Sequence, residues 1–237
     1  TLNQLLNKGM AAWQAEPFAP FVYQAEKQKP LPLNPAQALA VAAVVQALDS
    51  FSCLLLEGVT GSGKTEVYLQ AIQPVLAKGQ QVLVLVPEIG LTPQTLARFE
   101  QRFAVPMLTW HSNMNDGDRL RCWQRSQSGD AAIIIGTRSA LFLPFLQLGL
   151  LIIDEEHDQS FKQQDGFRYH ARDLAIKRAS LHQCPILLGS ATPSLESLYN
   201  VQQKKFQHLS LPQRATSQQV PVIELLDLKQ QVLKHGL

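Results

Sequence analysis

Short apolar runs recur along the middle of the chain and alternate with stretches of helical periodicity. The runs cover residues 53–57, 82–86, 106–109, 131–135, 149–153 and 186–189, of which 106–109 is the weakest. Most are continuously apolar rather than alternating, which is typical of strands buried on both faces of a parallel sheet. Between them we expect helices over residues 65–77, 92–102, 119–126, 172–181 and 194–202. The pattern predicts an α/β fold with a mostly parallel sheet and helices on both faces.

The two ends of the chain differ from this middle part. In residues 1–30 the sequence predicts a short helix and a strand over 10–13, and an extended Pro-Leu-Pro-Leu linker begins at residue 30. Asn34 and Pro35 then open a helix to about Leu48, because Asn caps helices and Pro suits the first helical position. Residues 213–237 turn to Gln, Ser and Pro, with one apolar run over 220–228. We therefore expect three parts, 1–30, 31–212 and 213–237, within a longer protein.

Composition narrows the class of protein. The chain is 46% hydrophobic and 17% charged, which indicates a compact globular protein. Its net charge of +2 is too small to indicate a nucleic-acid partner by itself. Its apolar runs reach about five residues, against the ~18 of a membrane helix. Cys53, Cys122 and Cys184 lie far apart without C-x-x-C spacing, which favours a reducing, cytoplasmic location and no zinc site in this chain.

Residues 58–65 match the pattern G-x-x-x-x-G-K-[ST] between a predicted strand and a predicted helix. In such a loop, backbone N–H groups curl around phosphate oxygens, and the helix N-terminus adds a favourable dipole. Lys64 would reach the β- and γ-phosphates of a nucleotide, and Thr65 would bind Mg²⁺. The other predicted nucleotide-binding residues are Gly58, Thr60, Gly61, Ser62 and Gly63. A chance glycine-rich turn is the alternative, and the strand–helix context argues against it.

The apolar run 149–153 continues into Asp154-Glu155-Glu156-His157. Acids at the end of a strand beside a phosphate loop are suited to hold magnesium. We expect Asp154 to hold Mg²⁺ through water and Glu155 to orient and deprotonate the attacking water. A solvated acidic loop is the alternative. Together the two motifs predict nucleoside triphosphate hydrolysis, while the absence of LSGGQ-like and N-K-x-D motifs argues against a transporter ATPase and a GTPase.

A third motif, Gly-Ser-Ala-Thr-Pro at 189–193, follows the last predicted strand. With the D-E-x-H element it resembles superfamily 2 helicases. That resemblance implies that Ser190 and Thr192 link the acidic motif to nucleic-acid binding, that Gln37 reads adenine, and that Arg138 grips a nucleic-acid backbone. Taken singly, Gln37 and Arg138 would more often be an ordinary surface amide and a surface charge.

Longer strings are very similar to the bacterial replication-restart helicases of the PriA family. They occupy residues 58–68, 86–94, 136–142, 154–158, 162–164 and 167–175, and the resemblance spans about 33–205. It implies the first RecA-like lobe of an ATP-driven, Mg²⁺-dependent 3′–5′ DNA helicase that acts at stalled forks. It also implies that 1–30 ends a winged-helix region, that 213–237 leads to a second lobe, and that zinc belongs to a further region outside this chain. DNA forks, single-stranded DNA, primosomal proteins and single-stranded DNA-binding protein are the implied partners of a monomer.

The stretch 161–172 interleaves flat rings with cations. Rings stack on bases while cations meet phosphates, so this alternation suits a single strand of DNA. In the PriA family it resembles the loop that couples DNA binding to hydrolysis. The predicted DNA or coupling residues here are Phe161, Lys162, Phe167, Arg168, Tyr169 and Arg172. The alternative is hydrophobic packing of Phe161 and Phe167 beneath the loop.

Two other functions remain open from sequence alone. One is a translocase on double-stranded DNA with the same kind of lobe, against which the string 88–94 argues. The other is a fragment that binds nucleotide or DNA and has no activity by itself.

Overall fold

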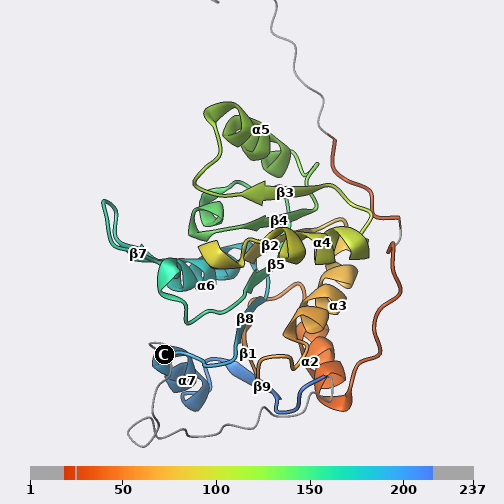
Figure 1. Ribbon diagram of the computed structural model, residues 1–237, viewed down its shortest axis with the longest axis vertical. Coiled ribbons are helices and arrows are strands. Elements are labelled where there is room, and N and C mark those ends of the chain that lie inside the picture. Colours follow the sequence, from red (N-terminus) through yellow and green to blue (C-terminus); the bar gives the residue numbers. More distant parts are fainter. Residues whose placement is uncertain (1–18, 25, 216–237) are drawn as a thin grey trace, which may run out of the picture.

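The computed structural model describes residues 19–24 and 26–215 and contains one large parallel sheet. Its strands lie in the order β3-β4-β2-β5-β8-β1-β9 (Figure 1). They are β1 (Cys53–Gly58), β2 (Gln81–Leu85), β3 (Met107–Trp110), β4 (Ile133–Gly136), β5 (Leu148–Ile153), β8 (Ile186–Ser190) and β9 (Gln207–Leu211). Every pair within this sheet is parallel. The predicted fold class is therefore confirmed, and the six predicted strands all lie within two residues of their expected bounds.

Six helices connect and cover these strands within the described ranges. They are α2 (Pro35–Gln46), α3 (Lys64–Ala77), α4 (Pro93–Arg102), α5 (Asp116–Gln127), α6 (Ala171–His182) and α7 (Leu195–Gln202). Short 3-10 turns occupy Glu88–Gly90, Arg138–Phe142 and Gln159–Phe161. The helix α5 begins three residues before its expected start, because the Asn115 side chain accepts a hydrogen bond from the Asp118 N–H and caps the helix there.

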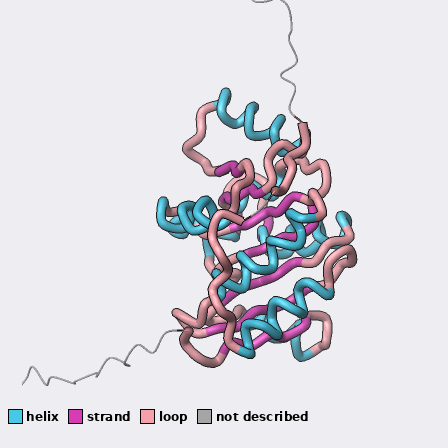
Figure 2. Tube along the Cα trace, turned by 90° about the vertical axis from the view of Figure 1, so that its right-hand side faces the viewer, coloured by secondary structure: helices cyan, strands magenta, loops and turns pink. Residues whose placement is uncertain are grey.

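The two faces of the sheet bury two separate cores. Successive strand residues point to opposite faces, so Leu54 packs with α2, α3 and α4, whereas Leu55 packs with α5 and α6. Val67 and Phe99 belong to the first core, and Ala175 belongs to the second. In Figure 2 the helices of the first face lie in front of the strands. This two-sided burial is the reason that the strand sequences are continuously apolar.

Two features of the fold were not predicted. The edge strand β9 pairs with β1 in parallel, but its sequence Gln-His-Leu-Ser-Leu is polar because only its last residue is buried. An antiparallel pair, β6 (Lys162–Gln163) with β7 (Tyr169–His170), forms the base of the aromatic stretch. The predicted helix and strand in residues 1–18 and the apolar run 220–228 lie outside the described residues.

An extended segment before α2 runs along the first helical face (Figure 1). The Phe21 ring is buried in the core, and the Lys27 N–H donates to the Arg102 carbonyl over 2.9 Å. The buried Arg102 guanidinium also forms an ion pair with Glu66 of α3 over 2.6 Å. The described parts of this segment thus pack against the lobe through Phe21 and Lys27, while the division of the chain at residues 30 and 212 stays a prediction.

The carboxyl ends of the parallel strands all meet at one edge of the sheet. The segments that follow β1, β4, β5 and β8 contain the three motifs and Arg138. Such an edge is where ligands bind in open α/β sheets. Among the described residues, no helix is long and apolar enough to cross a membrane.

Candidate nucleotide site and nucleic-acid surface

The loop between β1 and α3 forms an open cradle of backbone N–H groups. Gly61 and Gly63 have φ angles of +80° and +84°, a left-handed conformation that glycine adopts without strain. Within the described residues, the N–H groups of Gly61, Gly63, Lys64 and Thr65 donate no hydrogen bond. Unpaired N–H groups at a helix N-terminus are suited to bind phosphate oxygens. The donor chemistry of this loop therefore fits a nucleotide.

The two charged residues that the motifs predicted lie opposite each other. The Lys64 ammonium donates to the Gly58 carbonyl over 2.9 Å and lies 3.7 Å from Glu155 Oε1. Glu155 has φ +50°, which is uncommon and mildly strained for a residue with a side chain. The strained backbone belongs to the residue whose carboxylate faces the phosphate loop, as is frequent at functional sites.

Asp154 follows β5 and is held by a residue that the sequence analysis did not single out. The Tyr68 hydroxyl donates to Asp154 Oδ1 over 2.8 Å. Burial raises the pKa of Asp154, and burial also raises the pKa of Tyr68 well above its usual value, so Tyr68 stays a donor. Tyr68 lies four positions after Lys64 in α3, and such residues share a helix face. That spacing was the available sequence signal.

A cavity of about 660 Å³ brings the predicted catalytic residues together with the predicted nucleotide-binding residues other than Gly58 and Gln37. Thr60, Gly61, Ser62, Gly63, Lys64, Thr65, Asp154 and Glu155 line it, with Lys29, Leu31, Arg98 and Arg102 on another side. Thr65 and Asp154 carry the hydroxyl and carboxylate oxygens that Mg²⁺ prefers. These residues fit a magnesium nucleotide, in which the metal would neutralise charge on the phosphates.

Gln37 supports the phosphate loop from behind. Its side-chain Nε2 donates to the Ser62 carbonyl over 2.8 Å, and its Oε1 accepts from the Asn34 N–H over 2.9 Å. The residue is buried and is not among those that line the cavity. The expected role of Gln37 as an adenine reader stays a prediction. Its contact with Ser62 gives it a positioning role that the sequence did not indicate.

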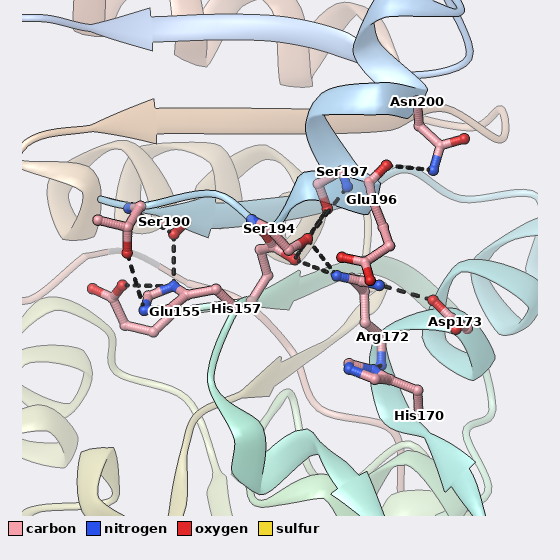
Figure 3. A network of polar contacts seen from close by, with 12 residues as sticks. Glu155, His157, His170, Arg172, Asp173, Ser190, Ser194, Glu196, Ser197 and Asn200 are labelled. Carbon is pink, nitrogen blue, oxygen red and sulfur yellow. Dashed lines mark hydrogen bonds and ion pairs between the residues drawn. The ribbon is translucent and has the colours of Figure 1, made fainter.

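The acidic motif contacts the Gly-Ser-Ala-Thr-Pro motif through His157 (Figure 3). His157 Nδ1 lies 2.7 Å from Ser190 Oγ, and Nε2 lies 3.2 Å from Thr192 Oγ1. Glu155 Oε2 lies 3.7 Å from the same Nδ1. The two motifs thus meet side by side at the ends of β5 and β8, and the predicted link of Ser190 and Thr192 to nucleic acid remains a prediction.

The third acid of the motif, Glu156, forms a buried network of hydrogen bonds with Arg172, Ser194 and Ser197; Figure 3 shows these three partners side by side. Its carboxylate accepts hydrogen bonds from Arg172 Nη1 over 2.9 Å, from the Ser194 N–H over 2.8 Å, and from Ser197 Oγ over 3.0 Å. Glu156 is 0% exposed and Arg172 is also buried. The Arg172 guanidinium thus binds Glu156 inside the protein, and its expected role in DNA binding or coupling stays a prediction.

The aromatic stretch separates into buried and exposed parts. Phe161 is 0% exposed, as the packing alternative predicted, whereas Phe167 is 77% exposed. The Tyr169 ring lies 6.0 Å from the Phe167 ring and meets the Phe142 ring edge-on at 5.3 Å. Phe142, which is exposed, was not singled out from the sequence, because it follows a different strand.

The predicted cations of this region come from two segments: Lys162 and Arg168 belong to the aromatic stretch, whereas Arg138 follows β4. The side chains of Lys162 and Arg168 are exposed. Arg138 is partly buried and donates through Nη1 to the Ser160 carbonyl over 2.9 Å, so it ties the segment after β4 to the start of the aromatic stretch. These positions leave phosphate contacts open to Lys162 and Arg168 and give Arg138 a structural contact.

A parallel α/β lobe with a phosphate loop, an acidic strand end and a serine–threonine motif beside it defines a P-loop nucleotide-hydrolase motor lobe. Residues 34–201 match the sequence model described as DEAD/DEAH box helicase, and the chain belongs to this family. It is 56% identical over 87% of its length to replication restart protein PriA of Haemophilus influenzae and 43% identical over its whole length to PriA of Bacillus subtilis. It covers 28% and 30% of these two proteins, less than a third of either. The resemblance to the PriA family is therefore confirmed.

Solved structures show the same fold. The structure of RecG bound to a three-way DNA junction matches 86% of this chain and 28% of its own, with a TM-score of 0.57 and 20% identity. The helicase domain of Pyrococcus furiosus Hef matches 79% of this chain and 40% of its own, also with a TM-score of 0.57 and 20% identity. These matches establish that the chain has the lobe fold of helicases.

Proposed function

We propose that this chain is the ATP-binding motor lobe of a DNA helicase that moves 3′ to 5′ and acts in primosome assembly and the restart of stalled replication forks. The observation that carries the proposal is the single cavity that Lys64, Thr65, Asp154 and Glu155 all line. The high identity to replication restart proteins PriA supports the assignment to restart.

The phosphate loop and the acidic motif have different tasks in the proposed hydrolysis of ATP. The backbone cradle and Lys64 bind the phosphates, and Thr65 with Asp154 holds Mg²⁺. The Glu155 carboxylate, 3.7 Å from the Lys64 ammonium, orients a water molecule and accepts its proton. The strained φ of Glu155 fixes that carboxylate on the cavity side before the nucleotide arrives.

The proposed DNA surface comprises the exposed rings and cations around β6 and β7. Phe167 and Tyr169 offer stacking faces, and Lys162 and Arg168 offer charge to phosphates. Ser190 and Thr192 contact His157 of the acidic motif, and we propose that they link this surface to the cavity. We propose a monomer in the cytoplasm that works with primosomal proteins and single-stranded DNA-binding protein, with zinc in a region outside this chain. This last part rests on similarity to PriA alone.

The test compares Lys64→Ala with Lys78→Ala in the full-length protein. Lys78 caps the opposite end of α3 and forms an exposed ion pair with Asp49. The Lys78→Ala change therefore removes the same kind of charge from the other end of the same helix. We expect Lys64→Ala to lose high-affinity binding of a fluorescent ATP analogue and Lys78→Ala to keep it. Phosphate release should rise with fork and single-stranded DNA in the unaltered protein. Unchanged ATP affinity in Lys64→Ala would contradict the proposed site, and stimulation by duplex DNA alone would indicate a translocase.

A further inference from the structure

Tyr68 lies in α3, the helix that follows the phosphate loop, and its hydroxyl lies at the ends of two strands, β5 and β8. It lies three positions after Thr65 and four after Lys64, so all three side chains share one face of α3. That face points toward the carboxyl ends of the central strands. The Tyr68 side chain is 2% exposed, and a buried tyrosine hydroxyl needs a hydrogen-bond partner. The partner that it has is Asp154, over 2.8 Å.

The hydroxyl also lies directly against the backbone of Gly189. A Cβ atom at position 189 would lie 1.7 Å from Tyr68 Oη, which is far inside contact distance. Only glycine therefore leaves room for the hydroxyl at the end of β8. The Gly189 carbonyl in turn accepts from the Glu156 N–H over 3.0 Å. The hydroxyl is thus enclosed by α3, the end of β5 and the end of β8.

We propose that Tyr68 is a positioning residue for the metal-holding carboxylate: its hydroxyl, seated against the bare backbone of Gly189, fixes the orientation of the Asp154 side chain. The inference rests on the proposed nucleotide site. A carboxylate can rotate about two side-chain bonds, and a hydrogen bond to one oxygen restricts both rotations. Residues that orient a metal ligand in this way typically affect metal affinity or activity by about 10–100-fold when they are changed.

The ring and the hydroxyl of Tyr68 can be tested separately. The ring packs in the core with Val67 and Ile72, and phenylalanine would keep that packing. Tyr68→Phe therefore removes only the hydroxyl, with its hydrogen bond to Asp154 and its packing against Gly189. Tyr23→Phe is the matched control, because Tyr23 packs against the same core and lies outside the cavity.

The measurement is the binding of a fluorescent, non-hydrolysable ATP analogue by the full-length protein, titrated with Mg²⁺ and repeated in EDTA. For Tyr68→Phe we expect the Mg²⁺ concentration at half-maximal enhancement to rise by about 10-fold or more. Nucleotide affinity in EDTA should stay at the unaltered value, and the thermal unfolding midpoint should fall by no more than the loss of one buried hydrogen bond accounts for. Tyr23→Phe should match the unaltered protein in all three measurements.

Gly189→Ala tests the contact between the Tyr68 hydroxyl and the end of β8 by changing the strand instead of the tyrosine. Its new Cβ displaces the Tyr68 hydroxyl, so it should raise the Mg²⁺ requirement by a similar factor. In the double variant with Tyr68→Phe, the rise should be smaller than the product of the two single effects, because both changes break one contact.

The outcomes are distinguishable. An unchanged Mg²⁺ requirement in Tyr68→Phe, or an equal loss of affinity in EDTA, overturns the positioning role. If the rise in the double variant equals the product of the two single rises, the proposal that Tyr68 and Gly189 act through one contact is overturned. If the unaltered protein binds the analogue without any dependence on Mg²⁺, the proposed function fails first, and this inference fails with it.

Discussion

The buried pair of Glu156 and Arg172 makes a strong prediction for stability. Arg172→Met keeps most of the side-chain volume of arginine and removes its charge and donors. It leaves the Glu156 carboxylate, which is 0% exposed, without the cation that lies 2.9 Å from it. Loss of one partner from a buried ion pair destabilises a protein because the remaining charge is uncompensated.

The structure sets the size of the expected effect. Breaking a buried pair typically costs about 3–5 kcal/mol in the free energy of unfolding. Three donors remain on Glu156, namely the Ser194 N–H, Ser194 Oγ and Ser197 Oγ, at 2.8, 3.1 and 3.0 Å. Because they still stabilise the carboxylate, we expect the lower end, about 3 kcal/mol. For a chain of this size that corresponds to a fall of about 6–12 °C in Tm.

Urea unfolding of the 237-residue chain, followed by circular dichroism, measures this loss. Asp173→Asn is the control, because Asp173 is exposed and its contact with Arg172 is 3.3 Å; it should cost about 1 kcal/mol or less. The double variant Glu156→Gln with Arg172→Met buries no charge and should lose less stability than Arg172→Met alone. A cost below about 1 kcal/mol for Arg172→Met, or a double variant less stable than the single one, would refute the reasoning.

Three further predictions concern activity. In the full-length protein, Glu155→Gln should keep ATP binding and slow phosphate release by about 10²–10⁴-fold, since it removes the base and keeps the shape; turnover near the unaltered rate would assign the base elsewhere. Joint replacement of Phe167, Arg168 and Tyr169 by alanine should leave basal ATPase largely intact and weaken its stimulation by DNA, whereas equal loss of both rates would make the loop structural. The 237-residue chain alone should bind Mg²⁺·ATP weakly, hydrolyse it very slowly and not unwind DNA, because an arginine supplied from elsewhere is typically worth about 10³–10⁵ in rate; robust DNA-stimulated ATPase from it would contradict this.

The sheet could be predicted from the sequence because its strands are buried on both faces. A run such as Ile133–Gly136 is apolar at nearly every position, and that signal is local. The edge strand β9 lacks it, since Gln207 and His208 are exposed, and no local pattern marks a strand with one neighbour. The start of α5 was missed for a similar reason: Asn115 caps a polar first turn that precedes the first apolar residue.

In the site, too, local motifs could be predicted from the sequence and long-range contacts could not. The phosphate loop and the acidic motif are each an unbroken run of residues, so the members of each motif could be named from the sequence. Tyr68 and Asp154 are 86 positions apart, and Arg172 and Ser194 are 22 apart. Contacts of this kind follow from how the strands are ordered in the sheet, which the periodicity does not specify. Ring–cation alternation likewise could not separate the buried Phe161 from the exposed Phe167.

The acidic motif distributes four consecutive side chains among four different parts of the lobe. Asp154 contacts Tyr68 of α3, and Glu155 faces Lys64 of the phosphate loop. Glu156 binds α6 and the first residues of α7, and His157 meets the hydroxyls that follow β8. The left-handed backbone at Glu155 makes this possible, because a turn within the motif sends neighbouring side chains in different directions. Strand β7 of the aromatic stretch leads directly into α6, whose second residue, Arg172, binds Glu156 next to the proposed base. The joint replacement in that stretch and Arg172→Met therefore probe two points along one physical connection.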